Sequence, residues 1–231
     1  MATGIVPAIG RPGIGSSITA QRLGVSRDGH LGYFPAGGVI EGTKTRDPGN
    51  SASSVRSLRP GLLMGIITAS QYWANSILGV TTGAYTSGGT SLSVSAATVT
   101  ELVRRFGSSG TFKLKGAATA GGAITTDTVT YSAASGTTIT ITNIGANRIA
   151  GSFIQPEDGS ETPRSFIPDG MNLLIDEDGN DISFPFIPCS GILDQGDLID
   201  WPSDTTLRTF IRESLSTLSG GKFVFADQFG D

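Results

Sequence analysis

The chain has 231 residues, of which 38% are hydrophobic, 16% are charged and 33 are glycine. This length supports one sizeable folded body, and a glycine content about twice the usual 7% favours strands and turns over helices. The sequence has no run of about 18 apolar residues and no basic stretch followed by an apolar segment at its N-terminus, so we expect no membrane partner, no secretory signal and synthesis in a host cytoplasm.

Charge is distributed unevenly along the chain. Residues 1–60 hold seven Lys/Arg and three Asp/Glu, residues 61–150 hold five and two, and residues 151–231 hold four and fifteen. Because opposite potentials steer association, this asymmetry favours head-to-tail contact with a copy or a partner. The basic residues are scattered, without the clustered Lys/Arg and interleaved aromatics that follow a phosphate backbone, so direct contact with nucleic acid is not expected.

Residues 1–57 differ in character from the rest of the chain. They are rich in Gly and Pro, show no regular periodicity, and yet carry apolar residues such as Ile5, Ile9 and Ile14. Such a segment cannot by itself bury enough apolar surface to offset its chain entropy. We expect an extended N-terminal arm that becomes ordered against a neighbouring molecule; a disordered leader is the alternative.

A globular body is predicted over residues 58–231, and its first half contains alternating strands. A turn at 58–61 precedes a buried strand at 62–68, and a half-buried strand follows at 91–95. A capping box at Thr98 to Glu101 predicts a short helix that ends at Gly107. The segments 111–115, 126–131 and 137–142 then predict a small β-meander, so residues 90–150 could form a Thr/Gly-rich subdomain or insertion.

The second half of the body predicts a hairpin, a helix and a closing strand. Segments 173–176 and 182–187 flank a turn at 177–180, and Pro185 favours an edge strand or a bulge. A helix capped by Ser203 or Asp204 runs to residue 218, and residues 222–225 read as a strand. The expected fold is mainly β with two short helices (α+β): a β-sandwich or barrel-like body with a small meander and an extended arm.

Motifs for chemistry are weak. Asp176, Asp178 and Asn180 resemble the start of a calcium loop, but the glycine is misplaced and Ile187 stands where a glutamate is needed. Residues 10–17 lack the lysine and the strand-to-helix context of a phosphate-binding loop. His30 is the only histidine and lies in a turn of the arm, and the single Cys189 has no thiol partner. We therefore expect no enzyme activity, no cofactor and no metal site.

Several of these segments together resemble a known family. They are the Ser57-Leu58-Arg59-Pro60-Gly61 turn with its apolar strand, residues 66–79, residues 173–188, and the closing unit 201–225. They resemble head decoration, or capsid cement, proteins of tailed bacteriophages over roughly residues 57–231. The resemblance implies a β-rich structural virion protein on the capsid surface that binds the major capsid protein, assembles as a homotrimer and has no catalytic residues. The long arm and residues 90–150 depart from the family pattern.

Capsid stabilisation also fits the arm, because a segment that touches several subunits adds weak contacts into avidity. The expected capsid contacts are Ile5, Ile9, Arg11, Ile14, Arg22, Tyr33, Phe34, Arg46, Arg56 and Arg59. Two alternatives remain open. A tail or adhesion module that binds host carbohydrate would use the Thr-rich meander and exposed Tyr72, Trp73 and Tyr85, and a hydrolase would require His30.

Overall fold

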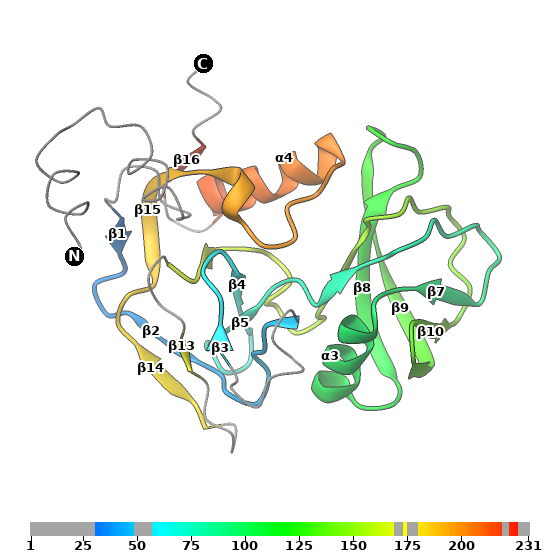
Figure 1. The fold of residues 1–231 in the computed structure, drawn as a ribbon, viewed down its shortest axis with the longest axis horizontal. Coiled ribbons are helices and arrows are strands. Elements are labelled where there is room, and N and C mark those ends of the chain that lie inside the picture. Colours follow the sequence, from blue (N-terminus) through cyan, green and yellow to red (C-terminus); the bar gives the residue numbers. More distant parts are fainter. Residues whose placement is uncertain (1–30, 49–56, 169–172, 175–179, 219–221, 226–231) are drawn as a thin grey trace, which may run out of the picture.

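The computed structural model describes residues 31–48, 57–168, 173–174, 180–218 and 222–225. Within them the chain is mainly β, with α-helices α3 (Ala96–Phe106) and α4 (Thr205–Glu213), and its curled sheets form half-barrels (Figure 1). The predicted fold class is thereby confirmed. A 3₁₀ turn, η2 (Gln195–Asp197), precedes α4, and a π-helical segment, η3 (Ser214–Leu218), continues it. None of the helices described is long and apolar enough to cross a membrane.

The strands form four sheets. The six-stranded sheet has the order β6-β11-β8-β9-β10-β7, the five-stranded sheet β12-β4-β5-β2-β14, the three-stranded sheet β1-β15-β16, and β13 pairs with β3. The strand bounds are β1 (Gly32–Tyr33), β2 (Gly38–Ile40), β3 (Ser57–Leu58), β4 (Leu63–Ile66), β5 (Trp73–Asn75), β6 (Gly79–Val80), β7 (Ser91–Ser93), β8 (Gly110–Ala117), β9 (Ile124–Ser135), β10 (Thr138–Ile141), β11 (Phe153–Gln155), β12 (Ser165–Phe166), β13 (Leu173–Leu174), β14 (Ile182–Phe184), β15 (Pro188–Leu193) and β16 (Lys222–Phe225).

The six-stranded sheet and α3 come from one continuous stretch, residues 79–155, which we call the barrel lobe; the other described residues form the base. The predicted meander is confirmed as β8, β9 and β10, which pair antiparallel in chain order. An isolated bridge between Thr81 and Val94 joins the ends of the two outermost strands, so the sheet curls back toward itself. The curl gives the sheet an inner face, and β10 buries every second side chain on it.

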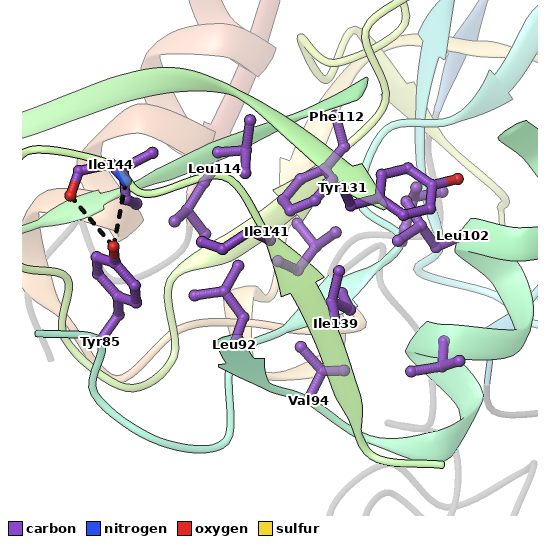
Figure 2. Close-up of a cluster of buried hydrophobic side chains, with 14 residues drawn as sticks. Tyr85, Leu92, Val94, Leu102, Phe112, Leu114, Tyr131, Ile139, Ile141 and Ile144 are labelled. Atoms are coloured by element: carbon purple, nitrogen blue, oxygen red, sulfur yellow. Dashed lines mark hydrogen bonds between the residues drawn. The ribbon is translucent and has the colours of Figure 1, made fainter. Parts of the chain in front are cut away.

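The barrel lobe has its own hydrophobic core (Figure 2). Leu92, Phe112 and Ile139 are each at most 1% exposed inside the curled sheet. The Tyr85 hydroxyl also lies inside, where it accepts from the Ile144 amide and has the carbonyl oxygens of Gly89 and Ile144 within reach of its single proton, at 2.8 and 3.2 Å. A buried hydroxyl needs such partners, so Tyr85 fixes the 85–90 segment against the 143–144 segment.

The five-stranded sheet of the base contains a strand from the expected arm. β2 lies between β5, which it pairs with in parallel, and β14, which it pairs with antiparallel. Residue Ile40 is 1% exposed and belongs to a core cluster with Trp73 and Ile187. The body therefore includes residues 31–48, and the remainder of the expected arm, residues 1–30 and 49–56, lies outside the described residues.

Helix α4 packs over the base and also reaches the barrel lobe (Figure 1). Leu207, Ile211 and Leu215 bury one face against a cluster that includes Phe223 of β16, and this confirms the predicted helix face and closing strand. Asp204 is the N-cap, as predicted, and accepts from the amides of Thr206 and Leu207. The same carboxylate accepts from the amide of Gly121 in the β8–β9 turn.

The predicted hairpin over residues 173–187 is wrong. β13 pairs with β3, whereas β14 pairs with β2, so the two segments belong to different sheets. Their apolar residues pair with strands that are distant in the sequence instead of with each other, so closeness along the chain does not decide the pairing here. Pro185 directly follows β14, an edge strand, in agreement with the expected edge position.

The predicted cap of α3 is also corrected. The helix begins one turn earlier, with Ser95 as the N-cap accepting from the amide of Thr98. Thr98 instead lies in the first turn, and its hydroxyl is 2.9 Å from that of Ser95. The predicted end is confirmed, since Gly107 follows the helix with φ of 91° and its amide donates to Val103.

Candidate contact surface and interlobe cavity

Tyr33 and Phe186 form an exposed aromatic pair at the surface of the base. Their side chains are 41% and 45% exposed, and they are the exposed large hydrophobic residues within the described chain. The rings meet edge to face, with centroids 5.8 Å apart and planes at 75°. Exposed large apolar side chains that lie together mark interaction sites more often than scattered ones do.

Local structure holds the aromatic pair in place. Tyr33 lies on β1, an edge strand that pairs with β15, and Phe186 lies in the link between the edge strand β14 and β15. Phe184 supports Phe186 from the core, with ring centroids 6.3 Å apart. Gly37 adopts φ of 60°, and a Cβ there would come within 2.5 Å of the Pro185 backbone, so the turn after Tyr33 requires glycine to approach this link.

The structure separates the expected contact residues into three groups. Ile5, Ile9, Arg11, Ile14, Arg22 and Arg56 lie outside the described residues. Tyr33 is exposed, whereas Phe34 is half-buried, with its ring 5.8 Å from Trp73. Arg46 is 8% exposed and donates to the carbonyl oxygens of Gly42 and Thr45, so its guanidinium is used inside the base.

Arg59, the last expected contact residue, is held by Asp47. Its Nε and Nη2 donate to the two carboxylate oxygens at 2.6 and 2.8 Å, and its amide donates to the same carboxylate. The Asp47 side chain is fully buried, whereas 41% of the Arg59 side chain is exposed. The hydrogen bond with Asp47 raises the pKa of Arg59, against the opposing effect of burial. The sequence gives no sign of this pair, because its two residues lie twelve positions apart and no periodic pattern links them.

A cavity of about 220 Å³ lies between the barrel lobe and the base, beside this pair. It is lined by Gly79, Val80, Thr82, Ser95, Ala97 and Thr98 from the lobe and by Pro48, Arg59, Ile199 and Asp200 from the base. Asp200 adopts φ of 59°, a strained left-handed conformation for a residue other than glycine. Burial raises the pKa of Asp200, Asp47 raises it further, and Arg59 opposes both.

Replacing Asp200 with asparagine is therefore expected to stabilise the protein at neutral pH by on the order of 1 kcal/mol or less. Because the folded-state pKa of Asp200 is raised, its ionisation costs folding stability as pH rises through that pKa, and the cost is absent below the unfolded-state value near pH 4. Asparagine also tolerates positive φ, but that gain does not depend on pH. Urea unfolding from pH 3.5 to 7.5 should show that the free energy of unfolding of the variant exceeds that of the wild type by an amount that grows with pH. If this excess does not change with pH, it comes from the backbone alone and the explanation from the Asp200 charge is wrong.

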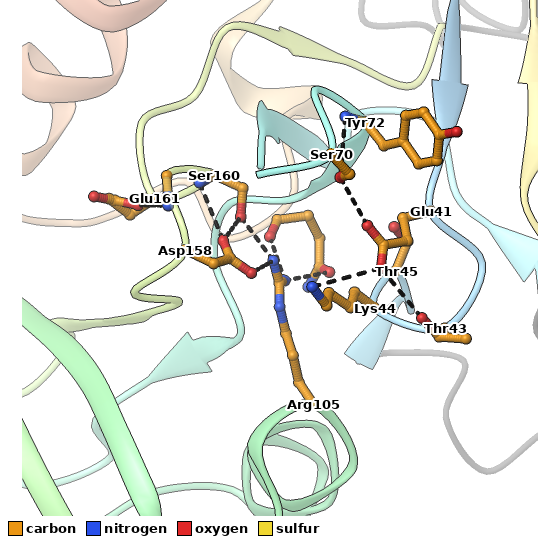
Figure 3. Close-up of polar contacts among 12 residues, drawn as sticks. Glu41, Thr43, Lys44, Thr45, Ser70, Tyr72, Arg105, Asp158, Ser160 and Glu161 are labelled. Carbon is orange, nitrogen blue, oxygen red and sulfur yellow. Dashed lines mark hydrogen bonds and ion pairs between the residues drawn. The ribbon is translucent and has the colours of Figure 1, made fainter. Parts of the chain in front are cut away.

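Arg105 on α3 fastens the barrel lobe to the base (Figure 3). Its fully buried side chain donates to the Asn75 carbonyl at 2.9 Å, to Asp158 at 2.9 Å and to Ser160 at 2.7 Å. Burial lowers the pKa of Arg105, and Asp158 opposes that effect. Burial would raise the pKa of Asp158, but Arg105 and hydrogen bonds from Ser160 outweigh it and hold that pKa below its ordinary value.

The expected aromatic platform for carbohydrate is not formed. Trp73 and Tyr85 are 6% and 4% exposed and belong to the cores, and Tyr72 is half-buried. Stacking on a sugar needs an open ring face, so this set of residues is corrected. The sequence signal misled because aromatics in a Thr-rich strand region fit a core as well as a surface.

Most of the residues considered for metal binding or catalysis in the sequence lie outside the part of the chain that the structure describes. No group of three or more His, Cys, Asp or Glu side chains there could hold a metal ion. Of the calcium-like loop only Asn180 is described, and His30 and residues 10–17 lie outside the described ranges. Cys189 on β15 is half-buried and unpaired with any other cysteine.

Comparison with known proteins gives no match: no family model, no curated protein and no solved structure is similar to this chain.

Proposed function

We propose that this chain is a structural virion protein that binds the outside of a tailed-phage capsid and stabilises the lattice of the major capsid protein. The observation that supports the proposal most is the aromatic pair, Tyr33 and Phe186, exposed at two sheet edges of a compact body. Aromatic side chains of this kind are the usual anchors of protein interfaces. The resemblance of residues 57–231 to head decoration proteins indicates the major capsid protein as the partner and implies a homotrimer.

The place of the aromatic pair in the chain also supports a contact role. Tyr33 is only three positions beyond residues 1–30 in the sequence, so the aromatic pair and that segment would reach a capsid together. Contacts from both would add through their linkage, since the second binding event becomes intramolecular once the first is made. A capsid lattice offers many equivalent sites, so each copy needs only modest affinity per contact.

The test is co-sedimentation of the purified protein with bare and expanded capsids of the same phage, together with its mass in solution. Replacing both Tyr33 and Phe186 with serine is expected to weaken binding at least about tenfold, because the pair loses its buried contact area. Saturable wild-type binding and a mass of three chains would support the proposal.

A matched control replaces Thr138 and Thr140 with alanine, since both are exposed on β10 of the barrel lobe. We expect wild-type binding from this control and unchanged thermal unfolding from both variants. A protein that ignores capsids, or a serine variant that binds as well as wild type, would contradict the proposal. Binding to a glycan array without binding to capsids would favour a tail or adhesion module instead.

A further inference from the structure

The cavity between the barrel lobe and the base combines three features that together point to a ligand. It has a volume of about 220 Å³, its walls come from segments far apart in the chain, and Asp200 is among the residues that line it. Within the described chain, the Asp200 carboxylate accepts no hydrogen bond and forms no ion pair, although burial disfavours its charge. A partly buried carboxylate without a partner is costly, and it is retained most readily where it has a task.

The charges around the cavity decide what kind of ligand fits. Asp47 and Asp200 supply two carboxylates, and Arg59 supplies one guanidinium. Arg59 is already committed to Asp47 through a bidentate contact, so it offsets the Asp200 charge only in part, without a hydrogen bond or ion pair. The opposite wall includes Ala97 and Thr98 in the first turn of α3, whose partial positive charge is weaker than a full ionic partner.

The backbone at Asp200 is also unusual. Its φ of 59° places an aspartate where most residues are strained, and the neighbouring Ile199 amide is tied to the Gly61 carbonyl at 3.0 Å. Strained positions that the surroundings hold in place are concentrated at functional sites. Here the strain is associated with a carboxylate that lines the cavity.

We propose that this cavity binds a compact organic cation with an ammonium or guanidinium group, and that Asp200 is the carboxylate that pairs with it. Thr82 and Ser95, which also line the cavity, offer hydroxyl groups to the rest of the ligand. Such a cation can come from a free small molecule, such as a diamine, or from a Lys or Arg side chain of another polypeptide. The inference rests on the cavity alone and does not depend on capsid binding.

The experiment titrates the full-length chain with cadaverine and with agmatine, followed by backbone amide NMR and calorimetry. Shifts confined to Gly79, Thr82, Ala97 and Asp200, with saturation, are expected for both probes. The uncharged probe 1-pentanol should not produce them. Unsaturable shifts spread over the acidic surface, or equal shifts with 1-pentanol, would overturn the proposal.

Three variants make the test specific. Asp200→Asn removes the charge while tolerating the same φ and should weaken binding at least about tenfold, a change that corresponds to the loss of one favourable ion pair. Ala97→Met fills the cavity from α3 without touching the carboxylate and should abolish binding. The control Asp194→Asn removes an exposed carboxylate that does not line the cavity but keeps an N-cap residue, so it should bind as wild type does. Binding that survives in both Asp200→Asn and Ala97→Met would refute the site.

A further arm of the experiment identifies the source of the cation. A peptide of residues 1–30 carries Arg11, Arg22 and Arg27. Displacement of cadaverine by this peptide would support a basic side chain from another copy as the ligand, whereas cadaverine binding without displacement would support a free small molecule.

Discussion

Replacing Arg105 with methionine is expected to lower the free energy of unfolding by roughly 3–5 kcal/mol. Methionine keeps much of the aliphatic volume but removes the charge, so Asp158 remains partly buried without its cation, and Ser160 and the Asn75 carbonyl lose their donor. Because these partners belong to the base and Arg105 belongs to the barrel lobe, the substitution weakens the contact between the lobe and the base. Urea unfolding followed by tryptophan fluorescence measures the free energy of unfolding.

Two comparisons test the explanation. Lys44→Ala removes an ion pair to Glu41 whose lysine is 36% exposed and whose atoms are 3.5 Å apart, so it should cost less than about 1 kcal/mol. Adding Asp158→Asn to Arg105→Met removes the orphaned charge, so the double variant should be more stable than the sum of the two single effects predicts. If Arg105→Met and Lys44→Ala lower the free energy of unfolding equally, the buried ion pair stabilises the protein no more than the exposed one and the explanation is wrong.

Deleting residues 2–30 is expected to abolish capsid co-sedimentation while leaving a folded body. The hydrophobic core clusters of the described chain begin at Leu31, so the deletion removes none of their members. Fully extended at about 3.3 Å per residue, the deleted segment could reach at most about 100 Å, enough to touch more than one capsid subunit. Losing linked contacts of this kind lowers apparent affinity by about 10²–10⁴-fold.

The deletion needs its own controls. Thermal unfolding of the shortened chain should match that of the full chain. A variant with Arg11 and Arg22 replaced by glutamine should lose part of its capsid binding, and the binding that remains should depend less on salt concentration than that of the wild type. Full retention of binding after the deletion would mean that residues 1–30 are not the capsid-binding arm.

Local signals predicted the elements that depend on nearby residues. The alternating segments that became β8, β9 and β10 show the period-2 pattern directly, and the helix from Asp204 has both a cap and an apolar face within one short stretch. The cap of α3 was misplaced by one turn because Ser95 and Thr98 are both hydroxyl residues three positions apart, and only the observed bond to the Thr98 amide separates them.

Contacts between segments that are far apart in the chain could not be predicted from local sequence patterns. The segments of β13 and β14 flank a turn as the strands of a hairpin would, yet their partners lie more than a hundred residues away in β3 and β2. The cavity combines residues from positions 48 to 200, and the Arg105 network joins residues 75, 105 and 158. A single sequence shows the chemistry of each residue but not which distant segments fold together, so Asp200 gave no signal as a site.

The pairing of β6 with β11 bears on how this protein could be re-engineered. Gly79 opposes Ile154 and Val80 opposes Phe153, so the chain enters and leaves the barrel lobe at neighbouring, hydrogen-bonded positions. Two adjacent ends define a cassette: another domain with closely spaced termini could be exchanged for the lobe, or a foreign epitope could be grafted at the open turn around Gly136, where a Cβ would meet no atom within 4 Å. Any exchanged cassette would have to carry its own substitute for Arg105, whereas a graft at the turn would keep that arginine and display the epitope at a site away from the base.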